Sequence, residues 1–343
     1  MRVSDCEIPE SAACGGLSRR QFVGLGSAAL LGGYAAYEVI GRIGGWGRGA
    51  TYIGRAAGYD APLVPVIRAG LAALGVDRGL VSGKRVLLKP NLVETAPGQP
   101  HINTHPSVVV AAAEVFREFD AREVIVAEGQ GHRRDSELVL DESGMGDALD
   151  SAGVQFIDLN HDTIERVRNR GRWTRLEELY LPRELLRADL VVSMPKLKTH
   201  HWVGVTCAMK NLFGVMPGVV YGWPKNPLHH QGIHQSIMDI NMTVRPALAI
   251  VDGIVGMDGD GPIMGEPVAA GCLVMGRNLA AVDATCVRVM GLNPEGVGYL
   301  KLARGRVGPV HEARIQQCGV GIEAVRTSFR VLDLEHLRSV RAG

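Results

Sequence analysis

The segment from residue 188 to residue 218 constrains the fold of this chain more than any other. It opens with an apolar run, Leu190 to Met194, whose length and composition are typical of a strand buried on both faces. Pro195 ends this strand, because proline has no amide hydrogen to donate to a neighbouring strand. Parallel sheets contain such strands, and their ligands bind just beyond the carboxyl ends of the strands. We therefore expect a binding site immediately after this strand.

The residues that follow carry the side chains such a site needs. We expect a loop at residues 196–201 and a helix-like segment at residues 206–214, which together contain Lys196, Lys198, His200, His201, Lys210 and Asn211. A solvated loop would also carry charges. Here, however, Trp202, Cys207 and Phe213 are interleaved with them, which favours a site. Lysines and histidines in this number indicate a ligand that is anionic, metallic or both.

Short apolar runs and helical patterns alternate along the rest of the chain. We expect strands at residues 86–88, 123–127, 154–159, 190–194, 247–251, 271–275 and 328–332. We expect helices at residues 61–74, 106–119 and 278–290, and an arginine-rich hairpin at residues 166–181. This alternation predicts an α/β fold: a mostly parallel sheet with helices on both faces and Rossmann-like layering. We assign residues 50–343 to a single α/β domain, and residues 38–59 read as a glycine- and arginine-rich linker.

Polar residues of similar kind follow four of the expected strands. They are Lys89 and Asn91, Glu128 and Gln130, the cations from Lys196 to His200, and Asp252. If these strands are parallel, their carboxyl ends lie on one edge of the sheet and the side chains converge. The alternative is that each polar group satisfies only its local backbone, and the sequence leaves both interpretations open.

Two histidines suggest a metal site. His230 and His234 are four residues apart, so one helix would place both on the same face. His200 or His201 could supply a further ligand, and Asp239, Asp252 or Asp258 a carboxylate. Gly232 weakens that helix, and histidines at this spacing are also common on surfaces. The six cysteines contain no Cys-x-x-Cys spacing, so we expect no iron–sulfur cluster. The cofactor is otherwise unknown, with a metal ion as one alternative.

The N-terminal residues are typical of an exported protein. Arg19 and Arg20 precede a weakly hydrophobic stretch rich in glycine and alanine at residues 24–37, a pattern that indicates a twin-arginine signal. We assign residues 1–45 to this signal and a linker, and expect the export machinery as a partner and a periplasmic location. No clear cleavage site follows, so an uncleaved segment could anchor the chain to the membrane. The net charge of +1 gives no overall attraction to nucleic acid.

Six motifs in order resemble the domain of unknown function family 362. They are VLLKPN at residues 86–91, NTHP at 103–106, VIVAEG at 124–129, PKLKTH at 195–200, KNLFG at 210–214 and the Asp252–Gly253 pair. The resemblance covers about residues 60–303 and implies that ten positions act together: Lys89, Asn91, His105, Glu128, Lys196, Lys198, His200, Lys210, Asn211 and Asp252. It assigns no reaction to them. Many relatives add a ferredoxin-like part with cysteine clusters, which this chain lacks. A looser likeness, in layout only, is to nickel-pincer lactate racemases.

Two functions follow from these observations. The first is an exported enzyme or cofactor-binding protein for a small anionic ligand, with Lys196, Lys198 and His200 as catalytic candidates and His200 as the proton carrier. The other positions would bind the ligand or cofactor: Lys89, Asn91, His105, Glu128, Lys210, Asn211 and Asp252. The second is a non-catalytic accessory or maturation module that delivers a metal or docks on an exported redox enzyme. It would expose an apolar patch at Trp202, Val219, Tyr221 and Trp223, residues that could equally form a lid.

Overall fold

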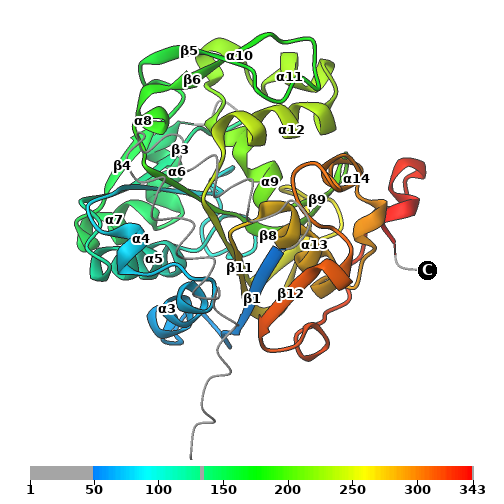
Figure 1. Ribbon diagram of the computed structural model, residues 1–343, viewed down its shortest axis with the longest axis horizontal. Coiled ribbons are helices and arrows are strands. Elements are labelled where there is room, and N and C mark those ends of the chain that lie inside the picture. Colours follow the sequence, from blue (N-terminus) through cyan, green and yellow to red (C-terminus); the bar gives the residue numbers. More distant parts are fainter. Residues whose placement is uncertain (1–48, 132–134, 342–343) are drawn as a thin grey trace, which may run out of the picture. The chain divides into compact units, whose positions relative to one another are not determined.

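A ten-stranded mixed sheet organises residues 49–131 and 135–341, which this computed structural model describes. Residues 46–343 form one compact unit. The strands are β1 (Gly49–Arg55), β2 (Arg85–Pro90), β3 (Glu123–Glu128), β4 (Gln155–Asp158), β7 (Leu190–Met194), β8 (Lys196–His200), β9 (Gly204–Thr206), β10 (Leu248–Asp258), β11 (Glu266–Gly276) and β12 (Ile315–Gly319). Their order is β12-β1-β11-β10-β7-β2-β3-β4, and β8 pairs with β10 and with β9 (Figure 1).

Parallel pairing dominates the part of the sheet that carries the expected site. Strands β4, β3, β2, β7 and β10 are each parallel to the next, so their carboxyl ends lie on one edge. β11 is antiparallel to both β10 and β1 and makes the sheet mixed. The structure therefore confirms the predicted α/β fold with a mostly parallel sheet.

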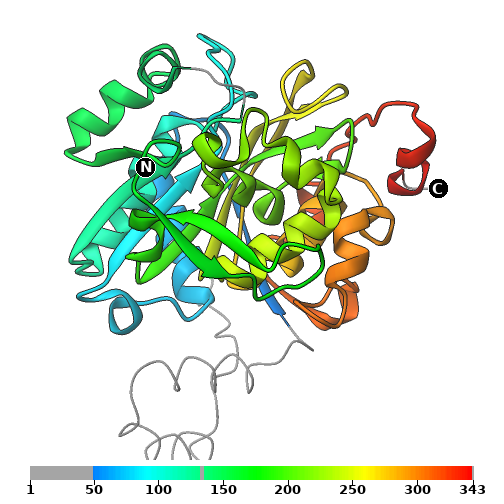
Figure 2. The same ribbon diagram turned by 90° about the horizontal axis from the view of Figure 1, so that it is seen from above.

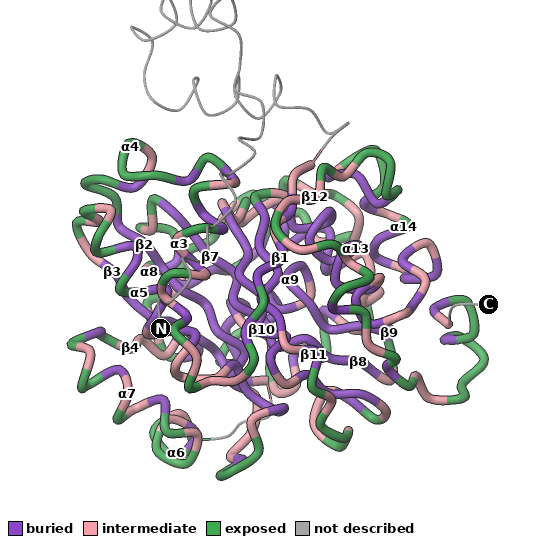
Figure 3. Tube along the Cα trace, turned by 90° about the horizontal axis from the view of Figure 1, so that it is seen from below, coloured by how far each residue is buried: buried purple, intermediate pink, exposed green. Residues whose placement is uncertain are grey.

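Helices cover both faces of the sheet. The helices are α3 (Leu63–Ala73), α4 (Arg78–Val81), α5 (Pro106–Glu118), α6 (Ser136–Glu142), α7 (Met145–Ala152), α8 (Arg183–Leu186), α9 (Ala208–Asn211), α10 (Gly218–Tyr221), α11 (Asn226–His230), α12 (Ile233–Val244), α13 (Leu279–Val289) and α14 (Gly298–Ala303). Successive strand residues point to opposite faces, so Val86 and Leu88 of β2 join the core under α3, α5 and α7, whereas Leu87 joins the core under α9, α12 and α13. Buried strands run between these two layers (Figure 3).

The arginine-rich segment forms the expected hairpin. β5 (Ile164–Arg168) pairs antiparallel with β6 (Glu178–Pro182) in a separate two-stranded sheet, which crosses the front of Figure 2 in green. Asp239 on α12 fixes the turn of this hairpin. Its carboxylate accepts hydrogen bonds from Trp173 N at 2.7 Å and from Asn169 Nδ2 at 2.7 Å. These bonds occupy Asp239, which the sequence had offered as a metal ligand.

Four expectations about secondary structure were wrong. Residues 196–200 form strand β8 rather than a loop, because β10 continues far enough to pair with it. The linker contains β1, which is held between β11 and β12. The last strand is β12 rather than residues 328–332, and its polar sequence gives little signal because it pairs on one side only. The helix expected over residues 206–214 is reduced to α9 and a 3-10 turn, Leu212–Val215.

Two further observations concern the chain as a whole. Within the described residues, no helix has the length and apolar composition needed to cross a bilayer. Cys207, Cys272 and Cys286 are buried cysteines that form no disulfide among the described residues. The expected export signal at residues 1–45 lies outside the described residues.

Candidate functional site

A cavity of about 280 Å³ lies at the carboxyl edge of the parallel strands. Its lining includes six of the predicted site residues: Lys89, Asn91, Glu128, His200, Lys210 and Asn211. They come from the ends of β2, β3 and β8 and from α9, segments that are far apart in the sequence. The structure therefore brings together most of the polar side chains at strand ends that the sequence predicted to lie close to one another. A second, more open depression lies between Arg288 and Arg326 and contains none of the predicted residues.

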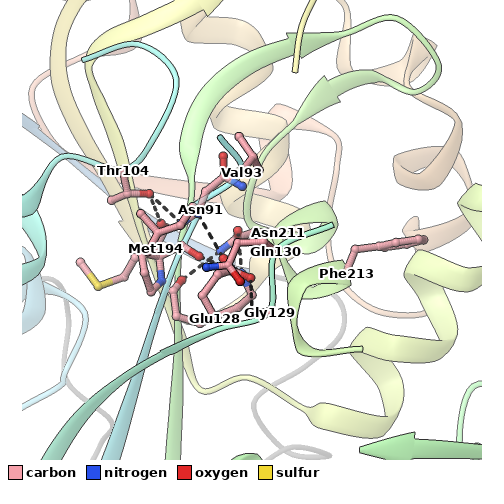
Figure 4. A network of polar contacts seen from close by, with 12 residues as sticks. Asn91, Val93, Thr104, Glu128, Gly129, Gln130, Met194, Asn211 and Phe213 are labelled. Carbon is pink, nitrogen blue, oxygen red and sulfur yellow. Dashed lines mark hydrogen bonds and ion pairs between the residues drawn. The ribbon is translucent and has the colours of Figure 1, made fainter. Parts of the chain in front are cut away.

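A buried ion pair forms the floor of the cavity. Lys89 Nζ donates to Glu128 Oε2 at 2.5 Å, to Asn211 Oδ1 at 3.1 Å and to the carbonyl of Pro90 at 2.8 Å. Asn211 Nδ2 donates to the carbonyl of Lys89 at 3.0 Å, so the two side chains fix each other. Figure 4 shows Glu128 and Asn211 meeting from different elements. Burial lowers the pKa of Lys89, and the adjacent Glu128 carboxylate opposes that shift.

The positions of the strand ends are fixed by a second set of hydrogen bonds. Thr104 Oγ1 donates to the carbonyl of Met194 at 2.7 Å and accepts from the amide of Asn91 at 2.9 Å (Figure 4). The Thr104 side chain thus ties the loop after β2 to the end of β7. Because both partners are main-chain groups, this contact positions the backbone on which the cavity depends.

Three predicted site residues form a separate buried network and do not line the cavity. Lys196 Nζ donates to Asp252 Oδ2 at 2.5 Å and to Tyr59 Oη at 2.8 Å, and Tyr59 Oη donates to Asp252 Oδ1 at 3.1 Å. The amide of His105 donates to Asp252 Oδ2 at 3.0 Å, and its ring stacks on Tyr59 at 3.7 Å. His105 also caps α5, because its Nδ1 accepts from the amide of Ser107. All three side chains are engaged with protein groups outside the cavity lining, and their catalytic and ligand-binding roles stay predictions.

Three more lysines lie at the cavity without a carboxylate partner. Lys225 is buried and Lys210 is half-buried, and both line the cavity. Lys198 is buried outside the lining and donates at 3.1 Å to the carbonyl of Pro262, which lines the cavity. Lys225 Nζ donates to the carbonyls of Gly129 and Phe213, at 2.8 and 2.9 Å. In the part of the chain that the structure describes, none of the three has an acidic group within ion-pair distance. Asp260 also lines the cavity but lies beside His201, so five lysines share the two buried carboxylates of Glu128 and Asp252.

The same burial lowers the pKa values of these lysines, so a larger fraction of each amine is neutral. It lowers the pKa of Lys210 to about 8, and the nearby Lys89 adds to the shift. It lowers the pKa of Lys225 to about 7 and that of Lys198 well below its ordinary value. An anion in the cavity would reverse these shifts, because an opposite charge favours the protonated amine.

Two neutral histidines complete the polar lining. Burial and the neighbouring Lys210 hold the pKa of His200 well below its ordinary value, and they lower that of His229 to about 4. His200 Nδ1 accepts from the amide of Trp202 at 3.0 Å, so its single proton lies on Nε2. His229 Nδ1 lies 3.2 Å from the carbonyl of Lys225, so its proton is on Nδ1 and its lone pair on Nε2. Burial therefore favours the neutral form of His200, and its role as a proton carrier stays a prediction.

Two buried polar atoms in the cavity lining have no hydrogen-bond partner among the described residues. They are Asn91 Oδ1 and Thr206 Oγ1. Buried polar groups in proteins nearly always find a partner, so unpaired ones in a cavity indicate a missing ligand or water. Asn91 was predicted to orient a ligand, and its free carbonyl oxygen fits that role.

Lys225 and His229 line the cavity but were not predicted as site residues. Both lie between the 3-10 turn Leu212–Val215 and α12, outside the six sequence motifs. Lys225 adopts a left-handed backbone conformation, φ +70°, between Pro224 and the Asn226–Pro227 pair. A lysine enclosed by two prolines is the one local signal that could have indicated an ordered turn. Its approach to Gly129, 96 residues away, is a property of the tertiary structure.

His230 and His234 do not share a helix. α11 ends at His230 and α12 begins at Ile233, with Gly232 between them at φ +97°. Neither histidine lines the cavity, and the ring of His234 packs against Gly298. Within residues 49–131 and 135–341 no group of three or more histidine, cysteine or acidic side chains is arranged to hold a metal ion. The helical geometry on which the metal prediction rested is therefore wrong.

The apolar residues expected to form a docking patch differ in their exposure to solvent. Trp202 and Val219 are both 51% exposed, and Trp202 lies on the cavity rim with Met264. Tyr221 is buried, and its hydroxyl accepts from the amide of Tyr180 at 2.9 Å. Tyr221 therefore anchors the hairpin and is not part of an exposed surface.

These features define a class: an α/β protein with a lysine-rich cavity at the carboxyl edge of a mostly parallel sheet. The chain belongs to the family described as Domain of unknown function (DUF362), whose model matches residues 86–288. The resemblance inferred from the six motifs is thus confirmed.

Two individual proteins are similar to this chain. Thylakoid-associated protein sll1697 of Synechocystis sp. is 30% identical over 254 residues, which cover 70% of this chain and 74% of the relative. Among solved structures, the lactate racemase apoprotein of Thermoanaerobacterium thermosaccharolyticum aligns with a TM-score of 0.43 and 15% identity. That alignment covers 71% of this chain and 57% of the racemase.

Proposed function

We propose that the protein binds a small anionic ligand in the cavity between β2, β3, β8 and α9. The observation that carries this proposal is the buried charge imbalance: Lys198, Lys210 and Lys225 have no carboxylate partner among the described residues. A buried, unpaired ammonium group is costly, because it loses its hydration without gaining an opposite charge. A carboxylate or phosphate in the cavity would supply that charge.

The unpaired polar atoms support a ligand that also makes neutral hydrogen bonds. Asn91 Oδ1 can only accept, so it calls for a donor such as a hydroxyl group or a protonated acid. Thr206 Oγ1 can donate to an anionic oxygen. The Nε2–H of His200 can do the same. A small hydroxy- or oxo-carboxylate or a phosphate ester matches this combination and fits a volume of about 280 Å³.

Calorimetric titration with phosphate and with a series of small carboxylates tests this proposal. Lys198→Met should weaken binding of the best anion by roughly tenfold or more, which corresponds to about 1.4 kcal/mol. The melting temperature of this variant should stay the same or rise, because an unpaired buried charge has been removed. A variant that loses affinity while gaining stability cannot owe the loss to unfolding.

Lys301→Met is the matched control, since Lys301 is exposed on α14 and is not part of the cavity lining. Its affinity and melting temperature should equal those of the unmodified protein. If no anion in the series binds, or if the Lys198 and Lys301 variants bind equally well, the anion site is contradicted.

We further infer that the chain is exported by the twin-arginine route. Arg19 and Arg20 and the glycine-rich stretch after them support this, and a relative named as thylakoid-associated is consistent with a location at a membrane. Arg19→Lys combined with Arg20→Lys should retain the full-length protein in the cytoplasm, as measured by cell fractionation. Unchanged export of this double variant would exclude the route.

A further inference from the structure

Lys210 has surroundings that differ from those of the other lysines around the cavity. Its side chain lines the cavity, and its Nζ lies 4.3 Å from the centre of the Phe213 ring. Among the described residues it has no carboxylate partner and no hydrogen-bond acceptor. Lys89 Nζ, in contrast, has three acceptors, and Lys225 Nζ has two. Lys210 is therefore the amine whose nitrogen is left free to react.

Burial also makes the neutral form of this amine accessible near pH 8. Burial and the charge of Lys89 together lower the pKa of Lys210 to about 8, against the opposing effect of Glu128. Desolvation and a neighbouring cation are the two effects that activate lysine as a nucleophile in proteins, because only the neutral amine has a lone pair to donate. The aromatic ring of Phe213 is too weak an acceptor to hold the proton against them.

We propose that Lys210 forms a covalent imine with the carbonyl carbon of a small 2-oxo acid bound in the cavity. The inference rests on the anion site proposed above, because the carboxylate of the ligand would be held by the neighbouring lysines. A bound carboxylate favours the charged form of Lys225, which lines the cavity, and of Lys198, which is hydrogen-bonded to the lining residue Pro262. Asn91 Oδ1, which has no partner among the described residues, accepts a hydrogen bond from the hydroxyl of the addition intermediate.

The covalent step balances without a further reactant. The lone pair of neutral Nζ forms a bond to the carbonyl carbon, and one Nζ proton is transferred to the carbonyl oxygen to give an aminoalcohol. The hydroxyl group then leaves as water with the second Nζ proton, and a carbon–nitrogen double bond forms. His229 Nε2, with a free lone pair, can carry these protons from nitrogen to oxygen, and His200 Nε2–H can donate a hydrogen bond to the reacting oxygen. The imine nitrogen then takes up one proton from solvent.

Reductive trapping tests the imine. The full-length protein is incubated with pyruvate or glyoxylate at about pH 8, near the pKa of Lys210, and treated with sodium cyanoborohydride. Peptide mapping by mass spectrometry should place a single adduct on Lys210, at a level roughly tenfold above that on exposed lysines such as Lys84 and Lys301. Propanal, which has a carbonyl group but no carboxylate, should give no preference for Lys210.

Lys210→Arg tests whether the adduct belongs to this amine. Arginine keeps the positive charge but forms no imine, so the adduct should disappear. No adduct, an adduct spread over the exposed lysines, or one that persists in Lys210→Arg would overturn the imine. Calorimetry on the unmodified protein decides the anion site independently, since retained binding without an adduct contradicts only the imine. Mapping of the unmodified protein decides the reaction even if the variant fails to fold.

Discussion

The five lysines of the site differ in whether a carboxylate compensates their positive charge. Lys89 and Lys196 each have a carboxylate at 2.5 Å, which offsets the loss of hydration. Lys198, Lys210 and Lys225 have none within the described residues, so each destabilises the empty protein or gives up its proton. An anion bound in the cavity would compensate the charge of these ammonium groups, so the site favours anion binding.

Anion affinity should fall as the pH rises through the pKa values of these lysines. In the empty cavity Lys225 titrates at about 7 and Lys210 at about 8, so both lose their charge between about pH 6 and pH 9. A bound anion favours the charged amines, so binding takes up protons over this range. Titration calorimetry in two buffers of different ionisation enthalpy measures the dissociation constant and the number of protons taken up on binding. A dissociation constant that is independent of pH would contradict the role of these lysines.

At the scale of elements, the turn after α9 depends on a glycine. Gly214 lies in the 3-10 turn Leu212–Val215, directly above the ion pair of Lys89 and Glu128. A Cβ atom at this position would collide with Glu128 Oε1 and with the Lys89 amine. The absence of a side chain therefore lets this turn close over the ion pair.

Gly214→Ala should disturb that ion pair and destabilise the fold by about 1–3 kcal/mol, the usual effect of overpacking. Chemical denaturation measures this change, and anion titration should show weaker binding because Asn211 and Lys210 precede the turn. Gly131→Ala is the matched control: Gly131 also lines the cavity, but a Cβ there would have open space around it. Equal stability of the two variants would show that the turn has room to adjust.

At the scale of the whole molecule, Asp283 joins three helices of one layer. Its carboxyl group, on α13, accepts from the amides of Ala208 and Met209 on α9, at 2.8 and 3.1 Å. Tyr299 on α14 donates to it at 3.0 Å. Burial raises the pKa of Asp283 to about 7. This one group therefore couples the position of α9, which carries Lys210 and Asn211, to the stability of the fold.

Asp283 should make the stability depend on pH. Its pKa is about 7 in the folded state and about 3.9 in the unfolded chain, so the folded protein binds the extra proton. The contribution is complete below about pH 4 and is lost as the pH rises to about 7, with a total of about 4 kcal/mol. Urea unfolding of the protein and of Asp283→Asn over this range measures the difference. Parallel stability curves for the two proteins would contradict this assignment.

The sequence by itself determined the layers of the sheet and the identity of most polar groups at its edge. Apolar runs such as Leu190–Met194 can be satisfied only between two layers of helices, so local composition was sufficient. The same holds for Lys89, Glu128 and Lys198, because a polar residue at the end of a buried parallel strand must lie on the common edge.

Only the tertiary structure decided which of these groups face the cavity and which face each other. Lys196 and Lys198 are two residues apart in β8, yet one is neutralised by Asp252 and the other has no carboxylate partner in the described chain. Lys225 enters the site from a distant turn, and Gly232 separates His230 from His234. Pairing depends on distances between segments that are remote in the chain, and no local pattern encodes those distances. The charge imbalance that defines the site is therefore a property of the folded molecule.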